Sequence, residues 1–376
     1  MKEIEKLNQV LQQIKNKFVG KDEVISLLGI GLVARENAFL LGPPGTAKSA
    51  IVRALSENIT DGKNFEYLLT RFTEPNEIFG PFDIRKLKEG ELITNTEGML
   101  PEASMVFLDE IFNANSAILN SLLLALNEKI FRRGKETRKL PALMFVGASN
   151  LLPEDEALNA LFDRFLIRVK SDYVSPDKLN EVLLAGWKME SNLDEKTTSI
   201  SAQEIIVLQK KCRTIDLSGI RTPYIDLVHS LRNTGIKVSD RRAVKLQNLI
   251  AASALICGRE QAILSDLWVL KYIWDTEEQV EILESMVGSI IEADASEKAH
   301  PQAFINNAPN SEELMKDLVL LSERWEEGAL TMEEKNVIKD KLRFIQSRCE
   351  WIQQAEKKQY IRQTIDALWQ KILQTI

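Results

Sequence analysis

A segment of eight residues carries the sharpest chemical signal in the chain. It consists of Gly42, Pro43, Pro44, Gly45, Thr46, Ala47, Lys48 and Ser49. The spacing matches the pattern G-x-x-x-x-G-K-[ST], in which backbone N–H groups and the start of the next helix form a nest for a polyphosphate. We expect Lys48 to contact the β- and γ-phosphates and the Ser49 hydroxyl to bind Mg²⁺. The alternative is a Pro/Gly turn with a solvated lysine.

Two acidic residues follow an apolar run further along the chain. The run 105–108 leads directly into Asp109 and Glu110. The carboxyl ends of parallel strands line the ligand crevice of a sheet, so we expect Asp109 beside the phosphates and in the Mg²⁺ shell. Glu110 is expected to polarise a water for attack on the γ-phosphate. Such a pair alone is as often a solvated turn, and the loop upstream favours the catalytic interpretation.

Two further polar side chains are candidates for the same site. Asn150 ends the apolar run 142–149, where its amide would reach the attacking water or the γ-phosphate, although such a residue is more often part of a turn. Arg164 precedes another apolar run. It is either an ion-pair partner of Asp163 or a finger that crosses a subunit boundary, a contact worth roughly 10³–10⁵ in rate.

Short apolar runs alternate with helical patterns over the first 170 residues and would position these groups. Five runs predict strands, at 38–41, 65–69, 105–108, 143–146 and 166–169. Four of them lack a polar alternation, as expected for parallel strands that are covered on both faces. The segments 49–59 and 115–126 carry apolar residues at helical spacing. The alternation predicts an α/β layered domain.

Composition narrows the class of protein. The 376 residues, 44% hydrophobic and 27% charged, are typical of a folded protein of two or three domains. A net charge of −7 argues against general binding to nucleic acid or to an anionic membrane. Three scattered cysteines and two histidines fit neither a disulfide framework nor a multi-histidine metal site. No signal peptide or apolar span of about 18 residues is visible, so we expect a cytoplasmic protein.

The order of these motifs resembles that of AAA+ ATPases, in particular the MoxR family and its regulatory ATPase variant A (RavA) subfamily. The resemblance covers about residues 18–292. It implies an α/β fold with an αβα P-loop core around a five-stranded parallel sheet, an all-α lid and a C-terminal helical extension. The implied domains are 1–175, 176–294 and 310–376. The core would contain a helix-2 insertion at about 72–100 and a hairpin at about 129–140.

The resemblance also assigns roles to single residues. Val19 and Gly20 match the segment that packs on adenine. Ala47, where glycine is usual, resembles the loops of the RavA subfamily and is therefore not expected to inactivate the site.

Three arginines and one amide take roles in the same way. Asn150 matches the first sensor, and Arg164 matches the finger that acts on a neighbouring subunit. Arg241 matches the second sensor, which contacts the γ-phosphate bound to its own subunit, and Arg242 is the competing candidate.

Members of the resembled family hydrolyse ATP to ADP with Mg²⁺ in hexameric rings and remodel partner proteins, often a von Willebrand factor A-domain protein. We therefore expect a homo-oligomeric, chaperone-like ATPase. The alternatives are a nucleic-acid-stimulated motor and an ATP-gated assembly scaffold. Six of the eleven residues 129–139 are basic, which suits a contact with phosphates or an acidic polypeptide. The same charges equally protect the edges of an exposed hairpin, and we do not expect nucleic acid as a partner.

Overall fold

The computed structural model describes residues 2–133, 136–174, 178–190, 198–292, 294, 296, 299–304, 311–326, 332–349 and 355–374. The chain divides into two compact units, Met1–Ala303 and Phe304–Ile376. Each unit has a buried hydrophobic cluster of its own. The two units therefore fold around separate cores.

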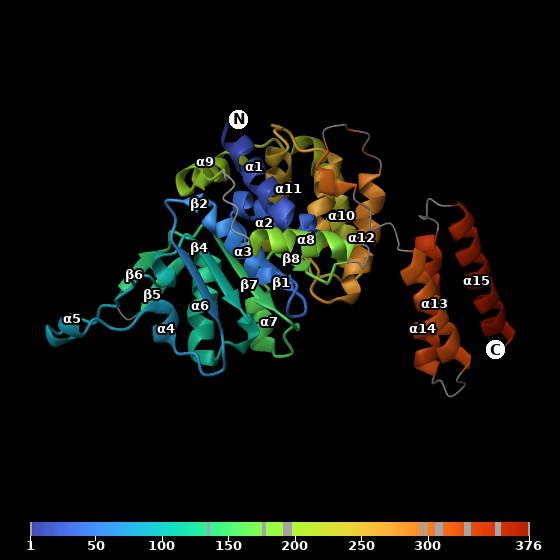
Figure 1. Cartoon of the computed structure of the whole chain (residues 1–376), viewed down its shortest axis with the longest axis horizontal. Coiled ribbons are helices and arrows are strands. Elements are labelled where there is room, and N and C mark those ends of the chain that lie inside the picture. The colour runs from blue at the N-terminus through green and yellow to red at the C-terminus, as the bar shows by residue number, and fades with distance from the viewer. Residues whose placement is uncertain are drawn as a thin grey trace. The chain divides into compact units, whose positions relative to one another are not determined.

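A five-stranded parallel sheet forms the centre of the first unit (Figure 1). Its strands lie in the order β3 (Asn64–Leu68), β4 (Met105–Asp109), β7 (Met144–Ser149), β1 (Ala38–Leu41) and β8 (Ile167–Lys170). All neighbouring pairs are parallel. The five strands predicted from the apolar runs are confirmed, each beginning within one residue of the expected start. β1 and β7 are buried along their whole length, which explains the absence of alternation.

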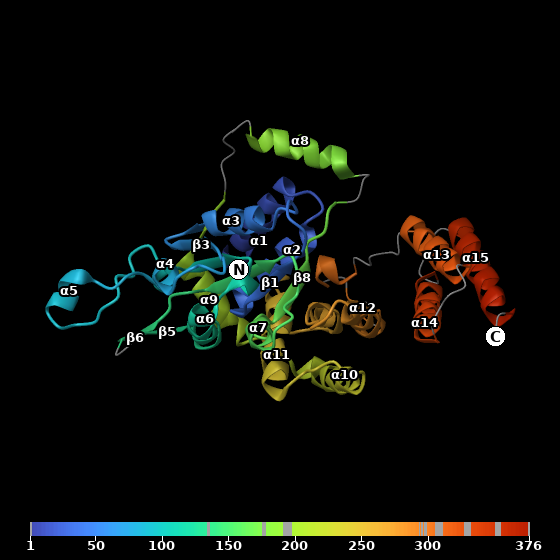
Figure 2. The ribbon, with the colours of Figure 1, turned by 90° about the horizontal axis from the view of Figure 1, so that it is seen from below.

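Helices cover both faces of this sheet. The helices of the core are α1 (Lys2–Lys17), α2 (Asp22–Ala34), α3 (Lys48–Glu57), α6 (Ser116–Glu128) and α7 (Glu156–Phe162). Figure 2 shows α3 and α6 on opposite sides of the sheet. This follows from right-handed crossovers that leave β1 and β4 in opposite directions along the strand order. α6 begins where it does because the Asn115 side chain accepts the N–H groups of Ala117 and Ile118.

The expected insertion and hairpin contact each other. The insertion contains α4 (Pro75–Phe79) and α5 (Ile84–Lys88) and is followed by the short helix η1 (Leu100–Glu102). The hairpin pairs β5 (Ile130–Arg133) with β6 (Glu136–Lys139). Arg133 donates to the carbonyl of Gly80 and to Asn76 Oδ1, both at 2.7 Å. The turn residue Gly134 lies outside the described residues. At least one basic side chain of the hairpin, that of Arg133, is thus bound within the chain.

Lys129 departs from the expectation of a row of exposed basic residues. It is only 9% exposed, its Nζ lies 3.1 Å from Asn37 Oδ1, and the ammonium sits 4.6 Å from the centre of the Phe145 ring. Burial, together with the charge of Arg35, lowers its pKa to about 7. Lys129 is therefore an internal residue at the end of α6, and its expected contribution to a basic surface is wrong.

The remainder of the first unit is mostly helical. Its elements are α8 (Leu179–Glu190), α9 (Ala202–Cys212), α10 (Arg221–Asn233), α11 (Asp240–Ile256), α12 (Glu278–Ile291) and the short helices η2 (Ile111–Asn113), η4 (Ser218–Ile220), η5 (Leu264–Tyr272) and η6 (Pro301–Ala303). One two-residue pair, β2 (Ile59–Thr60) with β9 (Ile200–Ser201), places a strand in the expected all-α part. The Ser239 hydroxyl caps the start of α11 by accepting the Arg242 N–H at 3.2 Å.

The described residues of the second unit form three helices. They are α13 (Ser311–Glu326), α14 (Met332–Cys349) and α15 (Ala355–Gln374). One apolar stripe of the last helix, formed by Ile361, Ile365, Leu368 and Ile372, is buried in the core of this unit. Spacings of four and three residues place these side chains on one face of a helix, which explains why they enter the core together.

Candidate functional site

The loop 42–49 joins β1 to α3 at the carboxyl edge of the sheet. A Cβ atom on Gly42 would come within 2.3 Å of the Ser171 carbonyl oxygen, so only glycine fits there. Ala47 has a φ of 65°, a left-handed conformation that disfavours any residue with a Cβ atom by roughly 1–2 kcal/mol. Within the described residues no side chain caps α3, which begins at Lys48. Its first N–H groups therefore remain available to an anion.

The Lys48 ammonium lies inside this loop. Its Nζ donates to the carbonyl oxygens of Gly42 and Pro43, the latter at 3.0 Å, and to Asn150 Oδ1 at 3.2 Å. Burial lowers the pKa of Lys48, while the charges of Asp109 and Glu110 oppose that shift. The lysine is therefore placed as a buried cation facing two carboxylates.

Two oxygen donors face each other beside the lysine. The Ser49 hydroxyl lies 3.5 Å from Asp109 Oδ2, and Asp109 Oδ1 accepts the Glu110 N–H at 3.0 Å. Mg²⁺ takes one or two oxygen ligands from a protein and completes its shell with water and phosphate oxygens. The donor set of Ser49 and Asp109 fits this ion.

The neighbouring carboxylate of Glu110 is held by two side chains from β7 and its end. Asn150 Nδ2 donates to Glu110 Oε1 at 2.6 Å, and the Ser149 hydroxyl lies 3.5 Å from Oε2. Because Asn150 also accepts from Lys48, its amide bridges the lysine and the carboxylate. Ser149 was not among the predicted site residues, although its position directly before Asn150 at a strand end was a usable signal.

A connector after β8 packs against the loop and against the turn that contains Val19 and Gly20. A Cβ atom on Gly20 would lie 2.6 Å from Val174 Cγ1, and Gly20 itself has a φ of 73°. The Ser171 hydroxyl donates to the Thr46 carbonyl at 3.1 Å, and the Tyr173 hydroxyl donates to the Pro44 carbonyl at 3.2 Å. Ser171 and Tyr173 were missed because the connector shows no periodic pattern.

Arg164 and Arg241 lie together at a different place. Both line a small pocket of about 30 Å³, and Arg241 donates to Asn127 Oδ1 at the end of α6. The backbone next to them is tied to the residue before β1, since Asn37 Nδ2 donates to the carbonyls of Leu126 and Arg164, both at 3.1 Å. The pair therefore sits at the amino edge of the sheet.

Arg164 also has the local partner that the sequence offered as its alternative role. Its Nη1 lies 3.9 Å from Asp163 Oδ2, and 29% of the Arg164 side chain is exposed. An ion pair of this length near the surface is worth at most about 1 kcal/mol. The guanidinium is thus able to exchange this carboxylate for an anion that binds it more strongly.

The length of β1 separates this pocket from the phosphate-type loop. Asn37 and Gly42 stand at opposite ends of the strand, about 16 Å apart at the rise of an extended chain. The structure thus does not bring Arg241 to the loop of its own chain, and the expected contact with a γ-phosphate on the same subunit does not fit this placement. Arg242, the competing candidate, is 7% exposed and contacts Asp275 Oδ1 at 3.0 Å, so it is not free to take that role.

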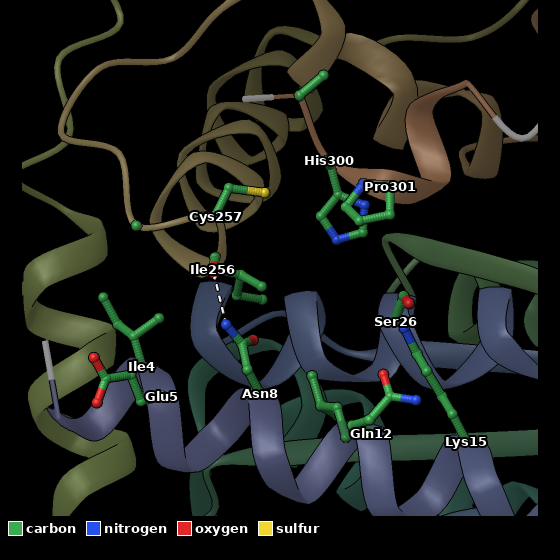
Figure 3. Close-up of a pocket in the computed structure, with 13 residues that line it drawn as sticks. Ile4, Glu5, Asn8, Gln12, Lys15, Ser26, Ile256, Cys257, His300 and Pro301 are labelled. Atoms are coloured by element: carbon green, nitrogen blue, oxygen red, sulfur yellow. Dashed lines mark hydrogen bonds between the residues drawn. The ribbon is translucent and has the colours of Figure 1, made fainter. Parts of the chain in front are cut away.

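A larger cavity, of about 520 Å³, lies elsewhere (Figure 3). Helix α1, the end of α11 and residues 299–301 line it, and Asn8 Nδ2 donates to the Ile256 carbonyl at 3.0 Å across one end. Burial lowers the pKa of His300 to about 3, so this imidazole is neutral. None of the described residues lining the cavity belongs to the predicted site. Cavity size alone would therefore have pointed away from the motifs.

Two negative findings apply to the described part of the chain. It contains no group of three or more His, Cys, Asp or Glu residues arranged to hold a metal ion. Within that same part, every helix is too short or too polar to cross a membrane. A metal at the loop would thus depend on phosphate oxygens in addition to protein ligands.

Comparison with known families agrees with this geometry. Residues 5–210 match the model described as the MoxR domain in the MoxR-vWA-beta-propeller ternary systems. Residues 214–287 match an AAA lid domain. The αβα core with a helical lid, which the resemblance implied, is confirmed by these matches and by the parallel sheet.

Individual relatives extend the comparison. An uncharacterized protein of Methanocaldococcus jannaschii is 36% identical over 307 residues, which cover 81% of this chain and 80% of that protein. The chaperone MoxR1 of Mycobacterium tuberculosis is 24% identical over 55% of this chain and 54% of its own length. A solved structure of a candidate ATPase from Cytophaga hutchinsonii has the same fold, with a TM-score of 0.63 and 20% sequence identity. The match covers 76% of this chain and 94% of that chain.

The matched regions include the loop, the acidic strand end and the lid. Nothing in them singles out the RavA subfamily, which stays a prediction. The chain belongs to the MoxR family of AAA+ ATPases.

Proposed function

We propose that this chain is a Mg²⁺-dependent ATP hydrolase that works as a homo-oligomeric ring and remodels a protein partner. The observation that carries the proposal is the convergence of Lys48, Ser49, Asp109, Glu110 and Asn150, which come from three separate segments, at one edge of the sheet. A cation, two candidate metal ligands, a carboxylate and an amide at the start of an uncapped helix form the set that phosphoryl transfer requires.

In the proposed reaction, a water oxygen bonds to the γ-phosphorus while the bond from that phosphorus to the β–γ bridging oxygen breaks. Glu110 would accept the proton of the water, and Asn150 would orient that carboxylate through the 2.6 Å hydrogen bond. Lys48 would leave the loop carbonyls for the β- and γ-phosphate oxygens. Ser49 and Asp109 would hold Mg²⁺, which supplies positive charge against the phosphates when bound. Val19 and Gly20 would contact the adenine.

We further propose that Arg164 and Arg241 both serve the nucleotide of a neighbouring copy. Support comes from their shared pocket and from the strand length of about 16 Å between that pocket and the loop of the same chain. A head-to-tail contact joins two different faces of identical chains, and it closes into a ring when the rotation permits. The assignment of Arg241 to the same subunit is replaced by this proposal.

The proposal has four further parts. We propose a hexamer, a lid over 176–294, a cytoplasmic location and a von Willebrand factor A-domain partner. The description of the matched family, which names such a domain and a β-propeller, supports that partner class. The second unit, with its separate helical core, is a candidate surface for the partner.

Calorimetry with the full chain tests the nucleotide site. Wild-type protein should bind MgATP, and Lys48→Ala should lose at least tenfold in affinity because a charged hydrogen-bond partner of the phosphates is gone. Lys63→Ala is the matched control, since Lys63 forms a surface pair with Glu102 and should leave binding unchanged. Absence of a binding signal in folded wild-type protein with Mg²⁺ would refute the proposed function.

A further inference from the structure

A cluster of two buried arginines and one partly exposed carboxylate adjoins the pocket of Arg164 and Arg241. The guanidinium groups of Arg168, on β8, and Arg242, on α11, share the carboxylate of Asp275. Arg168 is 1% exposed, and burial together with the charge of Arg242 lowers its pKa to about 10, so it is still protonated at neutral pH. Buried ion pairs often add little stability compared with apolar packing, so stability alone does not account for this cluster.

Arg168 holds the backbone on both sides of Arg164. Its Nε donates to the Phe165 carbonyl at 3.0 Å, and its Nη2 donates to the Phe162 carbonyl at 3.3 Å. The guanidinium carbon also lies 4.0 Å from the centre of the Phe162 ring. The two residues between these carbonyls are Asp163 and Arg164. Arg168 thus restrains the turn that presents Arg164.

Arg242 restrains the helix start that presents Arg241. Its Nη1 donates to Asp275 Oδ1 and Oδ2, at 3.0 and 3.2 Å, and to the Lys237 carbonyl at 3.0 Å. Arg241 is the preceding residue, so its backbone is held near this cluster, while its exposed side chain contacts Asn127. One carboxylate therefore links the supports of both arginines of the pocket.

The strand that carries Arg168 also reaches the phosphate-type loop. Just after β8, the Ser171 N–H donates to the Leu41 carbonyl at 2.7 Å, and the Ser171 hydroxyl donates to the Thr46 carbonyl at 3.1 Å. The short strand β8 thus contacts the Asp275 cluster through Arg168, and the residue that follows it contacts the loop 42–49. Strand backbones resist local extension, so the spacing between the two is defined.

We propose that Arg168 and Asp275 are positioning residues, which set Arg164 and Arg241 in the geometry needed by the nucleotide of the neighbouring copy. They do not touch that nucleotide. The inference rests on the proposed function, because it assigns a task to the arginine pair of that function.

Asp275→Asn is the principal test variant, since it keeps the shape of the side chain and removes the shared charge. We expect kcat for ATP to fall at least tenfold while MgATP affinity by calorimetry stays within threefold, because the loop is intact. Adding Lys48→Ala chains, which offer an intact arginine pair but lack their own nucleotide, should restore turnover. Arg168→Lys, which keeps the charge but not the fork of donors, should show the same split.

Asp266→Asn is the matched control. Asp266 is fully buried and pairs with Arg259 at 2.5 Å in the same unit, without contact to the arginine pocket. We expect it to lower stability as Asp275→Asn does, but to leave kcat within threefold of wild type. Equal losses of kcat in the two variants would show a general folding effect and overturn the proposal.

Hydrogen exchange separates this inference from the proposed function. In Asp275→Asn, amides 161–166 and 239–243 should exchange at least tenfold faster than in wild type, whereas those of 42–49 should not change. This readout needs no turnover, so it applies even if wild-type protein fails to hydrolyse ATP. Unchanged exchange at both segments, or a kcat within threefold of wild type, would refute a positioning role for Asp275.

Discussion

The two edges of the central sheet differ in how complete they are. At the carboxyl edge, Lys48 is matched by the carboxylates of Asp109 and Glu110, and each of these groups has partners within the chain. At the amino edge, the pocket lined by Arg164 and Arg241 also contains Arg242 and Lys245. Asp163 is its only acidic lining residue among those the structure describes.

This difference agrees with the proposal that two faces of identical chains contribute different groups to one nucleotide site. The carboxyl edge contains a nest, a cation and metal-ligand candidates, so it is equipped to receive a triphosphate. The amino edge has an excess of positive charge, and the loop of the same chain is too far away to use it, at about 16 Å. A site built from the two edges of neighbouring copies would satisfy both.

Removal of Arg164 at the amino edge should lower catalysis more than any other change considered. In Arg164→Ala we expect kcat to fall by about 10³-fold or more, the size of a finger contribution, with unchanged MgATP affinity. Turnover should return when Lys48→Ala chains are added, because these supply Arg164. Arg53→Ala, which breaks only a surface pair with Glu66, serves as the control. Loss of nucleotide affinity in Arg164→Ala would place this arginine in the same chain's site instead.

Removal of the base at the carboxyl edge should have the next largest effect. Glu110→Gln keeps the hydrogen-bonding shape beside Asn150 but accepts a proton poorly, so kcat should fall by about 10²–10⁴-fold while MgATP still binds. Steady-state ATPase assays and calorimetry measure the two quantities. Added Lys48→Ala chains should not rescue this variant, in contrast to Arg164→Ala. A turnover equal to wild type would show that another group accepts the proton.

The buried Lys129 near the amino edge should make the stability of the folded chain depend on pH. The pKa of Lys129 is about 7 in the folded chain and ordinarily 10.5, so between these values the unfolded chain binds more protons. The free energy of unfolding of the wild type should therefore rise with pH over this window, by at most about 1.4 kcal/mol per pH unit.

Lys129→Met removes this titration. Its gain in stability over wild type should be greatest near pH 7 and should shrink as the pH approaches 10.5. Urea unfolding of both proteins across the window measures the difference. A difference independent of pH would mean that Lys129 titrates normally in the folded chain.

The smallest effect is expected at Ala47. Ala47→Gly should relieve the left-handed strain of about 1–2 kcal/mol but add a backbone-entropy cost of about 0.5–1 kcal/mol, for a net gain of about 0.5–1 kcal/mol. Ala50→Gly, in the following helix, should instead destabilise by a similar amount. Urea unfolding compares the two, and a stabilised Ala50→Gly would contradict this account of the loop.

The sequence predicted most of the carboxyl edge because its information is local. Five apolar runs marked the strands, and parallel strands bring their ends to one edge, so the order of residues is enough to place Asp109, Glu110 and Asn150 near the loop. The bridging of Lys48 and Glu110 by one amide was not predictable, because it depends on side-chain distances across two strands. Two residues of the connector after β8, Ser171 and Tyr173, lie in a segment without periodicity and gave no signal.

The amino edge shows the limit of that reasoning. A motif match identified Arg241, but only the packing of α11 decides which edge its first turn meets, and that depends on contacts between segments some 200 residues apart, such as Asn248 with Glu36. The cluster of Arg168, Arg242 and Asp275 likewise joins a strand, a helix and a loop that no spacing rule connects. The strand ends and the loop 42–49 were thus determined by the local sequence. The arginine face was decided by tertiary packing, because burial and long-range hydrogen bonds, not neighbouring residues, set its geometry.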